Sequence, residues 1–317
     1  KEIHDQAPDF KDGINSFRYY RSQHPLLMNN GDVIFSSGEG PLVRLSKCNE
    51  IKWIIPEIFH HSNQKHNNDD LIYAVKRLKK NETNKLIYDD GYAVIDANSG
   101  TQIEEYSVEK ILLQNEKNLG IIYGIGDHER DRYHVNQVYP VTISDEYVQK
   151  DDVFISIRHQ SAIIHYRPST NRVINYITGP FAQQHDVDII SDKEISIFNN
   201  NNFITDKGLP HNEYSEVIIY NFETKKFRTL FNNQLQKENF QTEYQGLSHI
   251  FNDGALMVEE QNHGRIILFN NQGKKEWEFV NKDKNGDIGY VFWSRVIENE
   301  LFIEKFKSLI KSKKCLN

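Results

Sequence analysis

A repeated strand pattern constrains the fold of this chain more than any other feature of its sequence. In each copy, a short turn with Asp, Asn or Lys leads into four to six β-prone residues. The six copies are residues 31–35, 70–75, 152–157, 193–198, 253–258 and 299–303.

A hairpin follows each of the first five copies. Its signature is an apolar strand, a polar turn and a second strand. The hairpins cover residues 42–55, 93–106, 162–176, 217–231 and 266–280. A strand plus hairpin repeated at roughly 40 to 60 residues is the period of a β-propeller blade. We therefore expect an all-β fold, a six-bladed β-propeller forming one domain over residues 1–317 instead of the two domains that length alone suggests.

The interval between the second and third inner strands is too long for one blade. It contains residues 108–114, whose apolar positions fall at helical spacing, and the charged loop 127–132. We interpret it as a helical and loop excursion over one face. The last copy lacks its own hairpin, so we expect residues 1–30 to help close the ring and residues 305–317 to form a C-terminal tail.

Composition excludes several classes of partner. A net charge of -7 gives no basic field for nucleic acid, and no apolar run is long enough to span a membrane. Cys48 and Cys315 lack the spacing of a metal or redox site, and we expect unpaired thiols. The chain begins at Lys1 without Met; a removed signal or anchor is one interpretation and a sequence that omits such a segment is another, so targeting cannot be read from this end.

Histidines precede the repeated strands, in loops that a propeller would gather on one rim around its axis. They are His24, His60, His61, His134, His185 and His249, with Trp293-Ser294-Arg295 in the sixth position. Clustered imidazoles form a site for a metal, for general acid and base catalysis, or for an anion.

Four ordered motifs resemble the bacterial, nucleotide-independent arylsulfotransferases. Residues 131–140 resemble the D-x-x-H-x-N motif and residues 155–161 the S-x-R-x-x-S strand end. Residues 179–186 with 197–200 resemble the Q-H-D motif and the following F-D-N strand end. Phe59-His60-His61-Ser62 resembles an H-H-D element. The last two depart from the pattern, with Ser62 and Asn199 replacing carboxylates.

The resemblance implies a six-bladed propeller with a funnel-like active site and no cofactor. It implies transfer of a sulfuryl group from a phenolic sulfate ester to a hydroxyl acceptor, by a ping-pong mechanism through a sulfohistidine at His185. His134 and Arg158 would bind the sulfuryl oxygens, and His60 or His61 would complete the site. It also implies an exported protein, periplasmic or membrane-tethered.

The chemistry of these residue types suits that role. Neutral imidazole is a good nucleophile near pH 7, and a guanidinium fork is a fixed donor for anionic oxygens. Asn136 would orient His134 or donate to the sulfate. We expect four more substrate-binding residues in the channel: His60, Arg295, His249 and Glu259.

Other interpretations are weaker. No HxH or HExxH spacing supports a metal site, and residues 283–289 lack the Gly and Glu of a Ca²⁺ loop, which favours a polar hairpin turn. Gly124-x-Gly126 lacks the third glycine of a dinucleotide site, and Asp186 with Asp188 more plausibly orient a neighbour than hydrolyse a substrate. The remaining alternative is a non-catalytic propeller that binds an anionic, sulfated or carbohydrate ligand.

Overall fold

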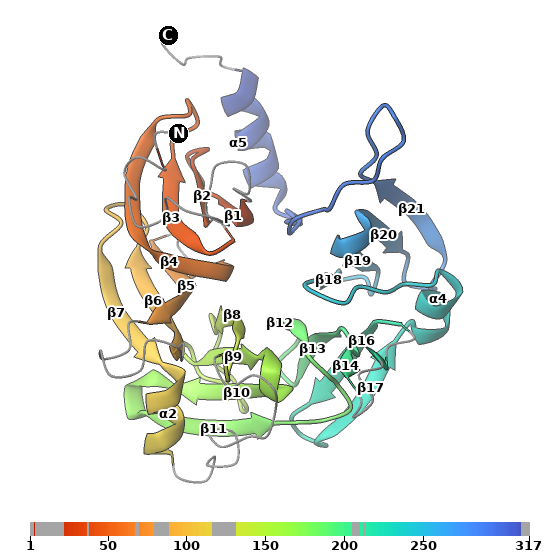
Figure 1. The fold of residues 1–317 in the computed structure, drawn as a ribbon, viewed down its shortest axis with the longest axis horizontal. Coiled ribbons are helices and arrows are strands. Elements are labelled where there is room, and N and C mark those ends of the chain that lie inside the picture. Colours follow the sequence, from red (N-terminus) through yellow and green to blue (C-terminus); the bar gives the residue numbers. More distant parts are fainter. Residues whose placement is uncertain are drawn as a thin grey trace.

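The computed structural model describes residue 3 and residues 22–36, 38–66, 70–78, 89–115, 131–204, 210–211 and 214–311. These residues form antiparallel sheets with few helices, so the expected all-β class is confirmed. Figure 1 shows the sheets arranged around a common centre in a propeller-like manner.

The first sheet has seven strands in chain order, β1-β2-β3-β4-β5-β6-β7. Their bounds are β1 Gln23–Leu27, β2 Val33–Ser36, β3 Gly40–Leu45, β4 Ile51–Lys65, β5 Leu71–Leu78, β6 Asp89–Asp96 and β7 Gln102–Ser107. The long strand β4 belongs to two four-stranded units, because its first part pairs with β3 and its last part with β5.

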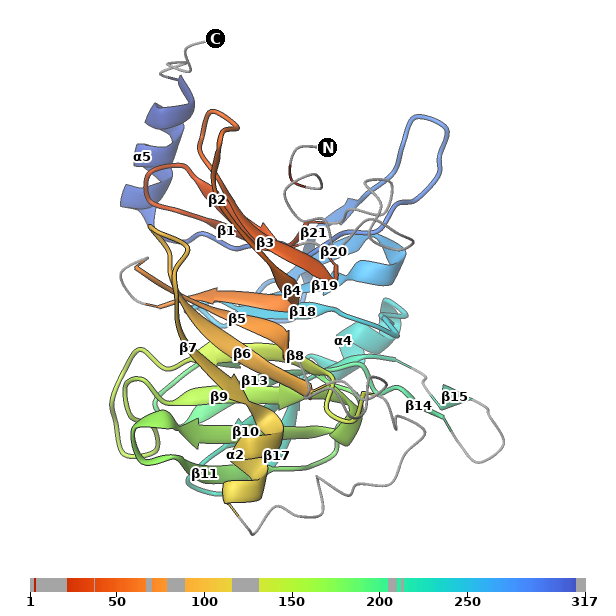
Figure 2. The same ribbon diagram turned by 60° about the vertical axis from the view of Figure 1, so that its left-hand side comes forward.

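Three further sheets of four strands follow. The second is β8 Val135–Pro140, β9 Val153–Ile157, β10 Ala162–Arg167 and β11 Arg172–Ile177. The third is β12 His185–Ile189, β13 Glu194–Asn199, β16 Glu216–Asn221 and β17 Lys226–Leu230. The fourth is β18 Leu247–Ile250, β19 Leu256–Glu260, β20 Arg265–Phe269 and β21 Lys275–Val280. A small pair, β14 Phe203–Ile204 with β15 Pro210–His211, extends from the third (Figure 2).

Three α-helices and three short 3₁₀ turns connect or flank the described strands. The helices are α2 Val108–Gln114, α4 Asn232–Lys237 and α5 Glu300–Lys311, and the turns are η5 Arg158–Gln160, η6 Pro168–Thr170 and η7 Gln261–His263. Helix α2 confirms the expected helix, with the Ser107 side chain accepting the Lys110 N–H as its N-cap. No helix in the described ranges is both long and apolar enough to cross a membrane.

Apolar residues fill the spaces between neighbouring sheets. Val75 and Tyr92 of the first sheet pack with Val135 and Ile155 of the second. Folding removes each of these side chains from water, and the burial of one stabilises the fold by about 1.5–3 kcal/mol. The first strand of each unit lies near the common centre of the sheets, as β8, β12 and β18 show in Figure 1.

The repeated strands, predicted to be innermost, are in fact second from the centre. An additional strand precedes each of the first five: β1, the last part of β4, β8, β12 and β18. The sequence did not reveal these strands. They carry or directly follow the histidines, so they determine where the site lies.

The prediction of a sixth repeated strand at residues 299–303 is wrong. Residues 300–303 begin helix α5, which lies beside the first sheet, with Lys65 Nζ 5.9 Å from the Phe302 ring. The described residues form five four-stranded units, so the count of six blades is not confirmed. Residues 22–27 join the first sheet through β1. The predicted role of residues 1–30 in closing the ring stays a prediction, because residues 1–2 and 4–21 lie outside the described residues.

Two further expectations change. Residues 305–311 are helical instead of a tail, and residues 312–317 lie outside the described part, as do residues 127–130 of the charged loop. Cys48 is disulfide-bonded, so the expectation of unpaired thiols is wrong for it. Residues 283–289 form the expected polar turn, in which the Asp283 carboxylate accepts the backbone N–H groups of Asn285 and Asp287.

Candidate active site

Five imidazoles from three sheets meet where the innermost strands begin. The ring centroid of His61 lies 4.9 Å from that of His134 and 6.1 Å from that of His185. His60 lies 5.0 Å from His61, and His159 of η5 stacks on His134 at 4.4 Å. We call these five residues the histidine cluster. The predicted convergence of His60, His61, His134 and His185 is therefore present in the structure.

Irregular backbone places these rings. The pairing register shifts at residues 59–63 of β4, 135–137 of β8 and 185–187 of β12. At or next to these bulges, His61, His134 and Asp186 have φ values of 54°, 48° and 42°. A left-handed conformation in a residue other than glycine costs about 1–3 kcal/mol and is typical of functional sites.

His185 presents a lone pair on Nε2. Its Nδ1 lies 2.6 Å from Oδ1 of Asn200, whose Nδ2 donates to the carbonyls of Thr242 and Gln245 at 2.9 and 2.6 Å. Those two bonds identify the atom facing His185 as the amide oxygen, an acceptor only, so His185 Nδ1 must carry the proton. Burial and the charge of Arg158 lower the pKa of His185 well below its usual value, and the ring is neutral at pH 7.

His60 and His61 have different roles in this geometry. Their Nδ1 atoms are 2.7 Å apart, so one donates to the other. His60 is fully buried with Nε2 3.4 Å from the Asp90 carboxylate, which favours a proton on that nitrogen. His60 Nδ1 is then the acceptor, and His61 keeps a lone pair on Nε2. His61 thus lines the cluster and His60 lies behind it.

An acidic network supports His134. Its Nδ1 donates to the Asp131 carboxylate at 2.6 Å, and Arg77 donates to both Asp131 oxygens and to Asp90. Burial lowers the pKa of His134 against the opposing effect of Asp131. The hydrogen bonds from His134 and Arg77 overcome burial and hold the pKa of Asp131 below its usual range.

Arg158 is the cation beside the cluster. Its side chain follows β9, is only 6% exposed, donates to Gln183 Oε1 at 2.6 Å and lies 5.5 Å from the Tyr244 ring. In the described part of the chain, no carboxylate is within ion-pair distance of it. Burial lowers the pKa of Arg158 to about 10, so it stays charged at neutral pH. An unpaired buried guanidinium is a binding site for an anion.

No hydrogen bond joins Asn136 to His134 among the described residues. Its Nδ2 donates to the Gln184 carbonyl at 2.6 Å, which positions the backbone immediately before His185. The residue is fully buried.

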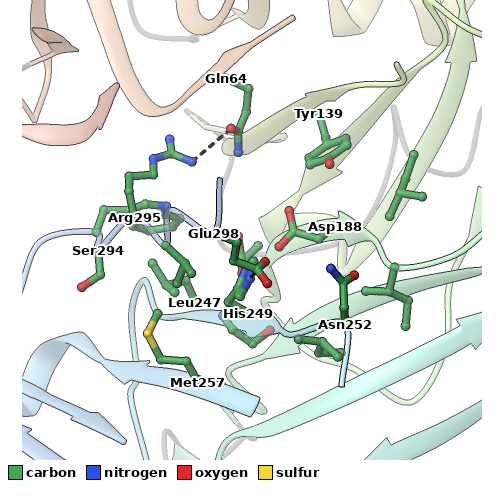
Figure 3. Close-up of a pocket in the computed structure, with 17 residues that line it drawn as sticks. Gln64, Tyr139, Asp188, Leu247, His249, Asn252, Met257, Ser294, Arg295 and Glu298 are labelled. Atoms are coloured by element: carbon green, nitrogen blue, oxygen red, sulfur yellow. Dashed lines mark hydrogen bonds and ion pairs between the residues drawn. The ribbon is translucent and has the colours of Figure 1, made fainter. Parts of the chain in front are cut away.

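Arg295 and His249 lie outside the histidine cluster. Both line a cavity further along the innermost strands, and Figure 3 shows them there with Asp188 and Tyr139. Arg295 donates to Gln64 Oε1, and His249 Nε2 lies 2.9 Å from the Glu298 carboxylate. They are therefore not part of the predicted constellation.

The expectation that Glu259 faces the channel is wrong. Its carboxylate is fully buried and accepts the backbone N–H groups of Trp293 and Ser294 at 2.9 and 2.7 Å, and the Gln261 amide. Those bonds hold the segment in which Trp293 packs on His24, with ring centroids 3.3 Å apart. The role of Glu259 is structural.

One group of described residues has the arrangement of metal ligands. The donor atoms of Asp131, His134 and His159 lie within 4.8 Å of one another. Both oxygens of Asp131 already accept hydrogen bonds from Arg77, and one of them also accepts from His134. A metal ion would have to replace these bonds.

Sequence reasoning missed several residues that orient the cluster. Asn200 is the last residue of the strand end that resembles F-D-N, Asp131 is the first residue of the D-x-x-H-x-N motif, and His159 follows Arg158. The motifs therefore contained or adjoined these residues, but gave no indication of their roles. Asp90 and Arg77 lie on β6 and β5 and carry no local signal. Only the fold brings them to His60 and Asp131.

Comparisons with known proteins identify the family of the chain and a structure of similar fold. A family model described as arylsulfotransferase (ASST) matches residues 24–282, while no curated protein matches the chain. A crystal structure of a protein of unknown function from Bacteroides caccae is similar in fold, with a TM-score of 0.56, 10% sequence identity, and coverage of 82% of this chain and 81% of that one. The Dos1 propeller aligns with a TM-score of 0.46 and 11% identity, over 84% of this chain and 60% of that one.

Proposed function

Because the chain belongs to the arylsulfotransferase family, we propose that it transfers a sulfuryl group from an aryl sulfate ester to a hydroxyl acceptor through a sulfohistidine at His185. The observation that carries this assignment is the bond between His185 Nδ1 and Asn200 Oδ1. It leaves Nε2 of a buried, neutral imidazole as the nucleophile.

The first step forms an N–S bond and breaks the S–O bond to the aryl group. His185 Nε2 attacks the sulfur, and the phenolate leaves with the bonding electron pair. The three sulfuryl oxygens carry negative charge, so the step needs fixed positive groups. Arg158 supplies a charge without a carboxylate partner among the described residues. The His134 ring centroid lies 4.9 Å from that of His61, and His134 can donate to a sulfuryl oxygen only in its protonated form.

The second step returns the enzyme to its starting state. The acceptor oxygen attacks the sulfur, the N–S bond breaks, and its electron pair returns to His185. The hydroxyl proton passes to Nε2 of His61. This nitrogen has a free lone pair because His61 donates from Nδ1 to Nδ1 of His60. Burial and the neighbouring imidazoles lower the pKa of His61, so the ring then releases this proton to solvent and is neutral for the next turnover. Small-molecule donors and acceptors therefore suffice, and no cofactor enters either step.

The proposal includes an exported, periplasmic setting. The disulfide at Cys48 supports it, because disulfides persist in oxidising compartments.

The test is steady-state turnover of nitrophenyl sulfate with and without phenol. We expect phenol to accelerate nitrophenol release with the parallel reciprocal plots of a ping-pong mechanism. We expect His185→Ala to reduce turnover by about 10³-fold or more. His263→Ala, an exposed imidazole outside the cluster, is the matched control and should retain wild-type rates. Equally slow release by His185→Ala and wild type, with or without phenol, would exclude the enzyme and leave a binding protein.

A further inference from the structure

A cavity of about 360 Å³ lies past the histidine cluster along the same innermost strands (Figure 3). Asp188 is three residues beyond His185 on β12, which is about 10 Å at the rise of a β-strand. The proposed sulfuryl transfer does not use this space. We call it the distal cavity, and its size is at the lower end for a small-molecule site.

One side of the distal cavity offers unpaired oxygen atoms. No hydrogen bond or ion pair is found for the Asp188 carboxylate within the described residues, nor for the Tyr139 hydroxyl. Figure 3 shows both side chains on the same side of the cavity. Burial raises the pKa of Asp188 to about 6, against the opposing charges of His249 and Arg295. A desolvated carboxylate without a partner is costly unless a ligand supplies a donor.

The opposite side offers a fixed positive charge. The Arg295 guanidinium donates to the carbonyls of Pro25 and Asn63 and to Gln64 Oε1, at 3.2, 2.7 and 3.1 Å. These neutral acceptors hold its position without neutralising its charge. No carboxylate in the described ranges lies within ion-pair distance of Arg295, although its field reaches Asp188. The two charges therefore lie across the cavity from one another without contact.

We propose that the distal cavity binds a small zwitterion, with its ammonium group at Asp188 and Tyr139 and its anionic group at Arg295. An amino acid or an aminosulfonate has this chemistry. A metal ion fits less well, because the metal-ligand geometry found among the described residues is at Asp131 and not here. Two other carboxylates line the cavity and both have partners: Asp186 accepts the Ser248 N–H at 2.8 Å, and Glu298 lies 2.9 Å from His249 Nε2.

The test measures binding by calorimetry and needs no turnover, so its result is independent of the sulfuryl-transfer proposal. The probes are glycine, β-alanine and taurine, with ethylammonium and acetate as single-charge analogues. We expect at least one zwitterion to saturate the wild-type protein below about 20 mM, and both analogues to bind at least about tenfold more weakly.

Isosteric variants then locate the site. Asp188→Asn should weaken zwitterion binding at least about tenfold, and Tyr139→Phe should weaken it less, because each removes one partner of the ammonium group. Asp192→Asn, an exposed carboxylate beyond β12, is the matched control and should bind as wild type does. Thermal melting checks that each variant is folded. Failure of all three zwitterions to saturate the wild type, tighter binding of a single-charge analogue, or wild-type affinity in folded Asp188→Asn would overturn the proposal.

Discussion

Oδ1 of Asn200 lies 2.6 Å from Nδ1 of His185, and both side chains are buried. Asn200 is an acceptor for the ring because its Nδ2 is occupied by the carbonyls of Thr242 and Gln245. It thereby selects the tautomer that exposes Nε2 without adding a charge. A neutral partner matters, since a carboxylate in this place would favour the protonated, non-nucleophilic ring.

Replacing Asn200 with Asp should therefore shift the pH dependence of the reaction. The added carboxylate raises the pKa of His185, so kcat/KM falls at low pH and recovers as the pH rises. The wild type should not lose rate as the pH falls from 8 to 6, because burial already lowers the pKa of His185. A pH–rate profile checks this. Asn202→Asp is the control, and a variant profile that superimposes on the wild type would refute the role of Asn200.

Arg158→Gln should reduce kcat/KM by about 10²–10³-fold, the usual cost of losing one fixed donor to an anionic transition state. Stability should change by less than about 1 kcal/mol, because within the described ranges the guanidinium has one hydrogen bond, to Gln183, and one ring contact, with Tyr244. Kinetics and thermal melting of the same samples separate the two effects. Arg228→Gln, which breaks an exposed ion pair with Glu194, should leave the rate unchanged. Loss of folding without a change in kcat/KM would contradict this assignment.

Binding of inorganic sulfate should strengthen as the pH falls. His134 directs Nδ1–H to Asp131, so only its protonated form can also donate from Nε2. Its pKa lies below the usual value because of burial, and the pKa values of His61 and His185 are lowered too. The inhibition constant should rise by up to about tenfold per pH unit above the pKa of His134. A constant independent of pH between 5 and 8, or a dependence retained in His134→Gln, would be inconsistent with this role.

Glu259→Ala should destabilise the fold instead of acting on chemistry. The variant leaves two buried backbone N–H groups at residues 293 and 294 without an acceptor, at a cost of about 3 kcal/mol. Urea unfolding measures this loss. Glu276→Ala, on the exposed face of β21, should cost under about 0.5 kcal/mol. A stable Glu259→Ala protein with impaired turnover would restore Glu259 to the active site.

The parts of the fold that depend on local patterns were predictable from sequence. Strands such as β5 and β9 have turn residues before them and β-prone runs, and α2 has helical spacing and an N-cap. The innermost strands were missed because polar residues and bulges at His61 and His134 interrupt their alternation. The apolar run in residues 301–303 is too short to distinguish a strand from the first turn of α5.

The candidate site, like the fold, was only partly predictable from the sequence. Motif order identified His134, Arg158 and His185, whereas the choice between His60 and His61 needed the position of Asp90. Adjacent residues in an irregular strand cannot be assigned to a face from sequence alone. Glu259 was misassigned because its partners, the backbone groups of residues 293 and 294, are far away in sequence.

The central claim is that His185 carries the sulfuryl group between donor and acceptor. Incubation with nitrophenyl sulfate in the absence of acceptor, followed by proteolysis under alkaline conditions and mass spectrometry, tests it directly. The account predicts one sulfuryl group on the peptide that contains His185, lost on addition of phenol and absent in His185→Ala. Nitrophenol release with no modified peptide, or modification at another histidine, would contradict it.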